Sequence, residues 1–313
     1  MIKLSPPVQL TNTLAAAQEC FDEIWNEAKH SQAGTYLQFM AVETQWRQRN
    51  LQYILGRGEP NAVGASPFAR RSSAAAPKEV GDLMFDRYRS GSSTDEAIVS
   101  HANRVSVGYC PYCGLYLRRK PHSANPDRDH IRPRSLFPEF SLMRLNLVVA
   151  CDDCNDAKLD QDVDDNGDWL FIHPYFDDFL DSSILVSNIS ANNGSPVIDF
   201  MLCSNLDSAV LRRLKRHVKT LDLFKRYRDD PLRNAVQILE AHQGHIVAGS
   251  ADVALVRRLL AEQGKREIAS RPNDPVGAIL IGLSNTQDLE LLLRAPRTLI
   301  PPVPAAQTVG GTP

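Results

Sequence analysis

The sequence predicts an α+β protein in which a small strand–loop–strand–helix unit lies between mainly α-helical N- and C-terminal regions. Two Cys-x-x-Cys pairs frame short apolar segments over residues 110–154, whereas apolar residues recur at helical spacing before and after that stretch. We expect a helical region over 1–100, a core over 101–180, a mixed and then helical region over 181–299, and a disordered tail over 300–313.

Composition limits the kinds of protein that this chain can be. Its 313 residues suffice for a real core, and 35 basic against 37 acidic residues give a net charge of -2. A nucleic-acid enzyme of this charge needs local basic patches. No apolar run is long enough for a membrane helix, and the N-terminus lacks the layout of a signal peptide. We therefore expect a cytoplasmic protein without a membrane partner.

The flanking regions have separate signals. The apolar pattern of residues 12–55 predicts two helices, and the Gly-, Pro-, Ser- and Ala-rich residues 57–78 predict a loop or linker. Strands are expected at 169–176, at 184–190 and, after an Asn-Asn-Gly turn, at 197–202.

The paired cysteines indicate a metal site. Cys110 and Cys113 form the first pair and Cys151 and Cys154 the second, so they supply the four thiolates of a closed tetrahedral zinc site. Gly114 suits the tight turn of a zinc knuckle. The alternative is a reduced core without metal.

Asp129 and His130 stand between the two pairs. Pro133 follows them, and the apolar residues 146–150 then lead into a helix that starts near Cys151. Without the cysteines, an Asp-His dipeptide would be read equally well as a surface ion pair. The order of strand, loop, strand and helix favours a catalytic site.

These motifs together resemble the HNH endonuclease family. They are Cys-x-x-Cys, Asp-His-x-x-Pro-x-Ser, Asn-Leu and Cys-x-x-Cys-Asn-x-x-Lys, within residues 110–158. The resemblance implies a ββα-metal core with a four-cysteine zinc knuckle and hydrolysis of DNA phosphodiester bonds. More loosely, the chain resembles bacterial anti-phage HNH nucleases such as the Septu type, which works beside an ATPase. A partner ATPase or sensor subunit is expected on that basis, and the oligomeric state stays open.

The resemblance also implies roles for single residues. His130 would be the general base, and Asp129 and Asn155 would bind a catalytic divalent cation. Asparagine at 155, where many relatives have histidine, favours Mg²⁺ or Mn²⁺. Asn146 would hold the His130 loop by hydrogen bonds, or would merely start a strand. Lys158 would reach a phosphate, or would be a solvated helix lysine.

Basic residues near this segment suggest contacts to the nucleic-acid backbone. The candidates are Arg118, Arg119, Lys120, Arg132 and Arg134. An inert basic edge is the alternative. A second basic run over 212–219 is either one side of a packed helix or a helix that follows DNA. His173 either returns toward the active site or packs against the core.

Two other functions compete with a DNA endonuclease. A zinc module that binds nucleic acid or protein without catalysis would use the cysteines and basic residues and leave Asp129 without a role. An RNA-directed nuclease would use the same phosphate chemistry. No Gly-rich phosphate loop is present, so ATP hydrolysis would have to come from another subunit.

Overall fold

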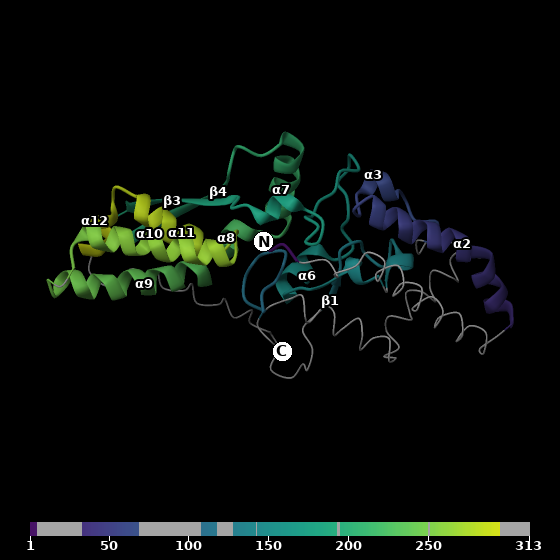
Figure 1. Cartoon of the computed structure of the whole chain (residues 1–313), viewed down its shortest axis with the longest axis horizontal. Coiled ribbons are helices and arrows are strands. Elements are labelled where there is room, and N and C mark those ends of the chain that lie inside the picture. The colour runs from purple at the N-terminus through teal and green to yellow at the C-terminus, as the bar shows by residue number, and fades with distance from the viewer. Residues whose placement is uncertain are drawn as a thin grey trace, which may run out of the picture. The chain divides into compact units, whose positions relative to one another are not determined.

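The structure is a computed structural model that describes residues 1–4, 33–68, 108–117, 128–141, 143–192, 195–249 and 251–294. It combines helices with two small antiparallel sheets, as expected for an α+β chain (Figure 1). The chain forms two compact units. Unit 1 comprises Met1–Ser182 and Asn205–Leu221, and unit 2 comprises Ser183–Ser204 and Asp222–Pro313.

Helix α2 (Ala33–Leu55) confirms the second helix expected in residues 12–55, whereas the first falls on residues outside the described part. From Glu43 onward its buried side chains follow a spacing of three and four residues. They are Trp46, Arg49, Asn50, Tyr53 and Ile54. The helix ends where the N–H of Gly58 donates to the carbonyl of Tyr53 and Gly58 takes a φ of 71°. One face of α2 is therefore fixed against the core of unit 1.

The described part of the loop or linker expected over 57–78 is mostly irregular, but it contains a short helix and buried side chains. Residues 57–68 include helix α3 (Pro60–Val63) and bury the side chains of Val63 and Phe68. The buried Arg49 donates to the carbonyl of Val63, and Ser66 donates to the Glu139 carboxylate at 2.6 Å. Buried charges need partners, and this stretch supplies them despite its composition.

The expected order of strand, loop, strand and helix is confirmed in unit 1. Strand β1 (Arg128–His130) pairs antiparallel with β2 (Leu147–Val149), with Asp129 opposite Val148. Two short 3₁₀ helices, η1 (Pro138–Phe140) and η2 (Arg144–Asn146), lie in the connecting loop. Helix α6 (Asp152–Lys158) follows, with Cys151 at its N-cap.

The strand expected at 169–176 is absent. Apart from an isolated bridge between Val163 and Trp169, this segment consists of turns, with η3 (Asp178–Asp181) after it. Its aromatic side chains are nevertheless largely buried. Isolated contacts hold its backbone in place of a strand ladder: Arg213 donates to the carbonyl of Phe171 at 2.8 Å, and the N–H of Leu4 donates to the carbonyl of Pro174 at 2.8 Å. Arg213 belongs to helix α7 (Ser208–Thr220), which was expected in the C-terminal region and lies in unit 1.

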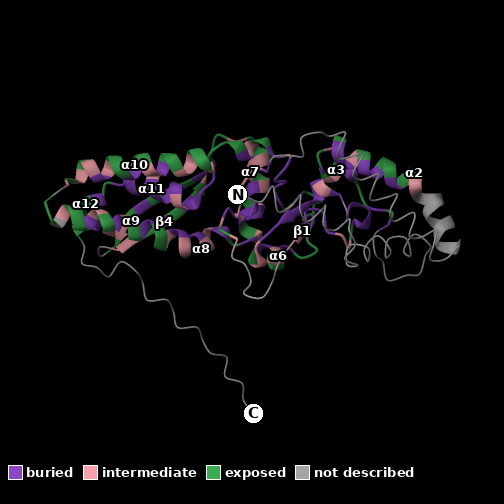
Figure 2. Ribbon diagram, turned by 60° about the horizontal axis from the view of Figure 1, so that its bottom comes forward, coloured by how far each residue is buried: buried purple, intermediate pink, exposed green. Residues whose placement is uncertain are grey.

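Unit 2 is built on the expected hairpin. Strands β3 (Leu185–Asn192) and β4 (Ser195–Leu202) pair antiparallel over their full length, from Leu185 opposite Leu202 to Asn192 opposite Ser195. The remaining helices are α8 (Leu223–Tyr227), α9 (Asp230–Val247), α10 (Val253–Ser270), α11 (Pro275–Asn285) and α12 (Leu289–Arg294). Helix α11 contacts β3, α9 and α10, and most of its residues are buried (Figure 2). None of the helices in the described ranges has the length and apolar character needed to cross a bilayer.

Candidate active site and metal centre

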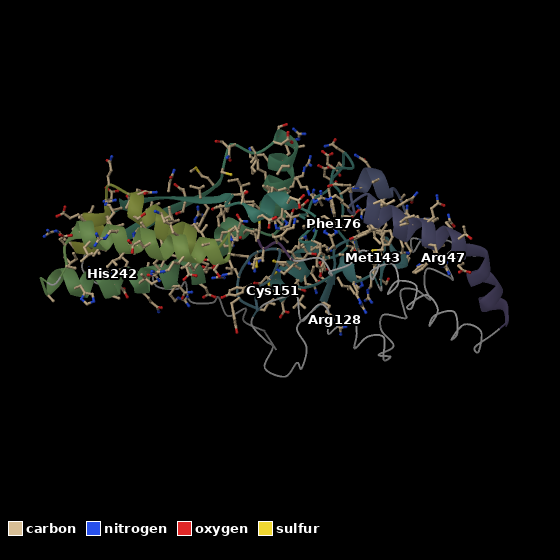
Figure 3. All side chains as sticks on the ribbon, in the orientation of Figure 1. Arg47, Arg128, Met143, Cys151, Phe176 and His242 are labelled. Atoms are coloured by element: carbon tan, nitrogen blue, oxygen red, sulfur yellow. The ribbon has the colours of Figure 1, made fainter. Side chains whose placement is uncertain are left out.

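The four paired cysteines meet in unit 1. The sulfur atoms of Cys110, Cys113, Cys151 and Cys154 all lie within 4.8 Å of one another. Gly114, at a φ of 75°, turns the chain so that its N–H donates to the carbonyl of Cys110 at 2.7 Å. Three of the four cysteines are buried, and the fourth, Cys151, starts α6 (Figure 3). The set could hold one zinc ion in tetrahedral sulfur coordination.

Tyr112, which lies inside the first cysteine pair, joins this cluster to two other elements. Its hydroxyl donates to a carboxylate oxygen of Asp129 on β1 at 2.7 Å. Its carbonyl lies 2.8 Å from Nε2 of His217 on α7, which donates to it. The cysteine cluster is thus tied to the strand that carries Asp129 and His130.

Asp129 forms a buried ion pair with Lys158. The Lys158 ammonium lies 3.3 Å and 3.2 Å from the two carboxylate oxygens and donates to the carbonyl of His130 at 2.6 Å. Burial raises the pKa of Asp129, while Lys158 and the Tyr112 hydroxyl act in the opposite direction. Carboxylate and amide oxygens, from Asp129 and Asn155, are donors of the type that Mg²⁺ and Mn²⁺ take. Asp129 fits such a cation only if the Lys158 ammonium turns away from it.

His130 is buried at the end of β1, and its ring is fixed by a main-chain contact. Its Nε2 lies 2.9 Å from the carbonyl of Ser141, which can only accept a hydrogen bond. Burial lowers its pKa to about 3, with the nearby charges of Arg134 and Lys158 adding to the shift. The ring is therefore neutral near pH 7, its proton lies on Nε2, and its basic lone pair is on Nδ1.

Asn146 does more than begin a strand. Its Oδ1 accepts from the backbone N–H of Arg132 at 2.7 Å and from the hydroxyl of Tyr53 at 3.1 Å. Its Nδ2 donates to the carbonyls of Arg132 and Phe140 at 3.1 Å and 3.2 Å. The fully buried amide thus bridges the two ends of the loop that follows His130.

Asn155 lies on α6, half-buried, three residues before Lys158. Residues three apart share a face of a helix, so Asn155 lies on the same side as the lysine that contacts Asp129. Asp129, His130, Asn146 and Lys158 are brought together around the β1–β2 hairpin and its loop by hydrogen bonds. Asn155 is connected to these residues through α6, which also carries Lys158.

Two side chains expected to contact phosphates are buried and paired with acidic residues. The guanidinium of Arg132 is buried, lies 2.9 Å from Asp162 and stacks on Phe137. Lys158 is fully buried against Asp129. Both charges are paired inside the protein. Arg134 is half-buried and stays a candidate, and Arg118, Arg119 and Lys120 lie outside the described residues.

Helix α7 is packed on one side and exposed on the other. Leu214, His217 and Val218 are buried. Arg213 pairs with Asp177 at 2.7 Å, and Arg216 pairs with Asp168 at 2.7 Å. Three basic residues remain exposed at spacings of three and four, namely Arg212, Lys215 and Lys219. The packed-helix alternative therefore holds for its inner face, and its outer face is a basic stripe.

Sequence reasoning missed two tyrosines of this site. Tyr112 had a signal, because it lies between two metal-site cysteines. Tyr53 had none, because it lies 93 positions before Asn146 and belongs to a helix with an ordinary amphipathic pattern.

Comparison with known proteins gives limited guidance. No protein-family model matches the chain, and no solved structure matches it. Protein ea31 of Escherichia phage lambda is 29% identical over 137 residues, which cover 43% of this chain and 43% of ea31. The chain therefore aligns with less than half of that relative's length, and a likeness of this extent does not assign it to a family.

Proposed function

We propose that this chain is an HNH-type endonuclease that hydrolyses phosphodiester bonds in DNA. The observation that supports it best is a neutral, buried His130 at the end of β1, beside Asp129 and next to a helix that begins within the cysteine cluster. A general base needs a lone pair that is held in one orientation and that can accept a proton near the working pH. The contact from Nε2 to the Ser141 carbonyl provides that orientation.

In the proposed reaction, Nδ1 of His130 takes a proton from a water molecule while the water oxygen attacks phosphorus. The new P–O bond forms as the bond from phosphorus to the 3′ oxygen breaks; that oxygen takes a proton from solvent water, and His130 returns its proton to solvent. Asn146 keeps the His130 loop closed through its bonds to Arg132 and Phe140. A divalent cation at Asp129 and Asn155 would supply positive charge for the phosphorane and the leaving oxygen.

Zinc has a separate role in this proposal. Cys151 and Cys154 lie at the start of α6, and Tyr112 links the first cysteine pair to Asp129. A zinc ion on the four thiolates would therefore hold the strand and the helix in register, as structural zinc sites do.

The proposed setting is anti-phage defence beside an ATPase or sensor subunit. It rests on the motif resemblance alone. The name of the phage lambda relative states no activity.

Cleavage of supercoiled plasmid DNA tests the proposal. Purified protein should nick it with Mg²⁺ or Mn²⁺, and His130→Ala should abolish cleavage while zinc stays bound. His217→Ala is the matched control, because His217 is also buried and also donates Nε2 to a main-chain carbonyl. Retained cleavage in His130→Ala, or equal loss in both variants, would exclude His130 as the base.

One observation favours the alternative of a zinc module without catalysis: Lys158 already neutralises Asp129. Binding of DNA without cleavage under any divalent metal, alone or with products of neighbouring genes, would support that function. Matched DNA and RNA duplexes, digested side by side, would distinguish a DNA nuclease from an RNA nuclease.

A further inference from the structure

A buried hydrogen-bond chain leads from His173 to the loop that carries His130. The Tyr53 hydroxyl lies 2.9 Å from Nε2 of His173 and 3.1 Å from Oδ1 of Asn146. All three side chains are fully buried. They come from α2, from the turn segment after α6, and from the residue before β2.

The donors and acceptors of this hydrogen-bond chain can be assigned in one direction. Asn146 Oδ1 can only accept, so the single Tyr53 proton points toward it, with the Leu145 carbonyl at 3.4 Å as a second acceptor. The phenol oxygen must then accept from His173, whose proton lies on Nε2. In the reverse direction, the Tyr53 proton would point toward Nε2 of His173. The Tyr53 oxygen would then face two acceptor oxygens with no proton between them, and the N–H on His173 Nδ1 would be buried without a partner.

His173 is itself held from several sides. Its backbone N–H donates to Asp177 at 2.6 Å, and Asp177 is paired with Arg213 of α7. The Trp169 ring packs edge-on against the imidazole, with centroids 5.5 Å apart. A Cβ atom on Gly58 would lie 2.9 Å from Cδ2 of His173, so only glycine leaves room for the ring there.

Asn146, at the other end of the hydrogen-bond chain from His173, binds the loop that follows His130. Asn146 binds Arg132, two residues after His130, and Phe140. Phe140 precedes Ser141, whose carbonyl holds Nε2 of His130. Any shift of the Asn146 amide therefore moves both main-chain segments that orient the imidazole.

We propose that Tyr53 and His173 are positioning residues for His130, acting through Asn146 to hold the loop between Arg132 and Ser141 in one conformation. The inference rests on the proposed nuclease function for its effect on rate. Its structural part, the order of the loop, stands apart from that function.

Tyr53→Phe tests the proposal, with Tyr175→Phe as its matched control. Tyr175 is also a buried tyrosine, and its hydroxyl donates at 2.8 Å to the carbonyl of Leu147, the residue after Asn146. Both variants lose one buried hydroxyl, but only Tyr53→Phe breaks the chain. We expect Tyr53→Phe to lower kcat on plasmid DNA by about 10- to 100-fold with little change in KM, and Tyr175→Phe to change kcat by less than about threefold.

A second readout does not depend on activity. In ¹⁵N NMR of the full chain, Tyr53→Phe should speed hydrogen exchange of the Arg132 amide, which donates to Asn146, and shift the His130 ring nitrogens. His173→Gln, which keeps an N–H donor, should resemble the unmodified chain, whereas His173→Ala should resemble Tyr53→Phe.

Equal kcat, equal Arg132 exchange and equal His130 shifts in Tyr53→Phe and Tyr175→Phe would overturn the proposal. If the purified protein cleaves no nucleic acid, the proposed nuclease function is wrong. The Arg132 exchange rates would still decide whether Tyr53 and His173 hold the loop.

Discussion

At the scale of single residues, burial decides the protonation of His130 and His217. His130 and His217 each donate Nε2 to a main-chain carbonyl, and burial lowers the pKa of each to about 3. An imidazolium in either place would lose most of its hydration. Neutral imidazole is therefore the stable form at both positions near pH 7.

We predict that His217 makes the protein more sensitive to acid. Its pKa is about 6.5 in the unfolded chain and about 3 in the folded one, so the stability it contributes is complete above pH 6.5 and is lost as pH falls toward 3. Between pH 7 and pH 5 this loss amounts to about 2 kcal/mol. Urea unfolding at both pH values, with zinc in excess, measures it.

His217→Gln is the comparison for that measurement, because glutamine keeps a donor for the Tyr112 carbonyl and does not titrate. The unmodified chain should lose about 2 kcal/mol more than the variant over this pH interval. Other titrating groups, including Asp177, whose pKa burial raises to about 6, cancel in the difference. The same loss in both proteins would contradict the prediction.

At the scale of elements, α6 depends on the cysteine cluster. With seven residues the helix is too short to be stable by itself, and both its N-cap, Cys151, and its third residue, Cys154, belong to the cluster. Lys158, at its other end, closes the ion pair with Asp129. Helix, cluster and strand β1 therefore form one cooperative piece.

Removal of zinc should loosen this piece and spare the hairpin of unit 2. After chelation, we expect faster amide exchange in α6 and at Gly114, and unchanged exchange at the paired amides of β3 and β4. Cys154→Ala should abolish binding of one zinc per chain. Cys203→Ala, at a cysteine of unit 2 outside the cluster, should retain it. If the amides of α6 stay fully protected from hydrogen exchange in the metal-free protein, α6 does not depend on the cysteine cluster.

At the scale of the whole molecule, charge is nearly balanced, with a net charge of -2. The proposed binding of nucleic acid would therefore depend on local basic patches. The outer face of α7 offers one, since Arg212, Lys215 and Lys219 are exposed while Arg213 and Arg216 are paired with acidic residues. Contacts of this kind bind phosphates without regard to base sequence.

We predict that this stripe contributes about three phosphate contacts. Replacing Arg212, Lys215 and Lys219 by Gln should reduce the slope of log K against log salt by about 3 for duplex DNA of any sequence. Fluorescence anisotropy across a salt series measures the slope. Replacing the exposed Arg258, Lys265 and Arg266 of α10 by Gln is the charge-matched control. An equal change in both triple variants would show that α7 has no special role in binding.

The sequence by itself determined the features that depend on local spacing. The cysteine pairs, the strand–loop–strand–helix order, the β3–β4 hairpin and α7 all follow from short motifs or periodic apolar patterns. Such motifs and patterns can be recognised in the sequence without knowing what each helix or strand packs against. The apolar residues 169–176 were expected to form a strand because a buried segment without a strand ladder can have the same apolar composition.

Only the tertiary structure decided which polar groups are used inside the protein. Arg132 was expected to contact a phosphate because it lies beside His130 in a basic segment, and Lys158 because it lies one helical turn beyond Asn155. Each is buried because a distant carboxylate, Asp162 or Asp129, meets it in the fold. Tyr53 reaches Asn146 across 93 positions, a contact that no local pattern encodes. Pairing between residues far apart in the chain is a property of packing, and this packing places buried polar residues behind the loop that holds His130.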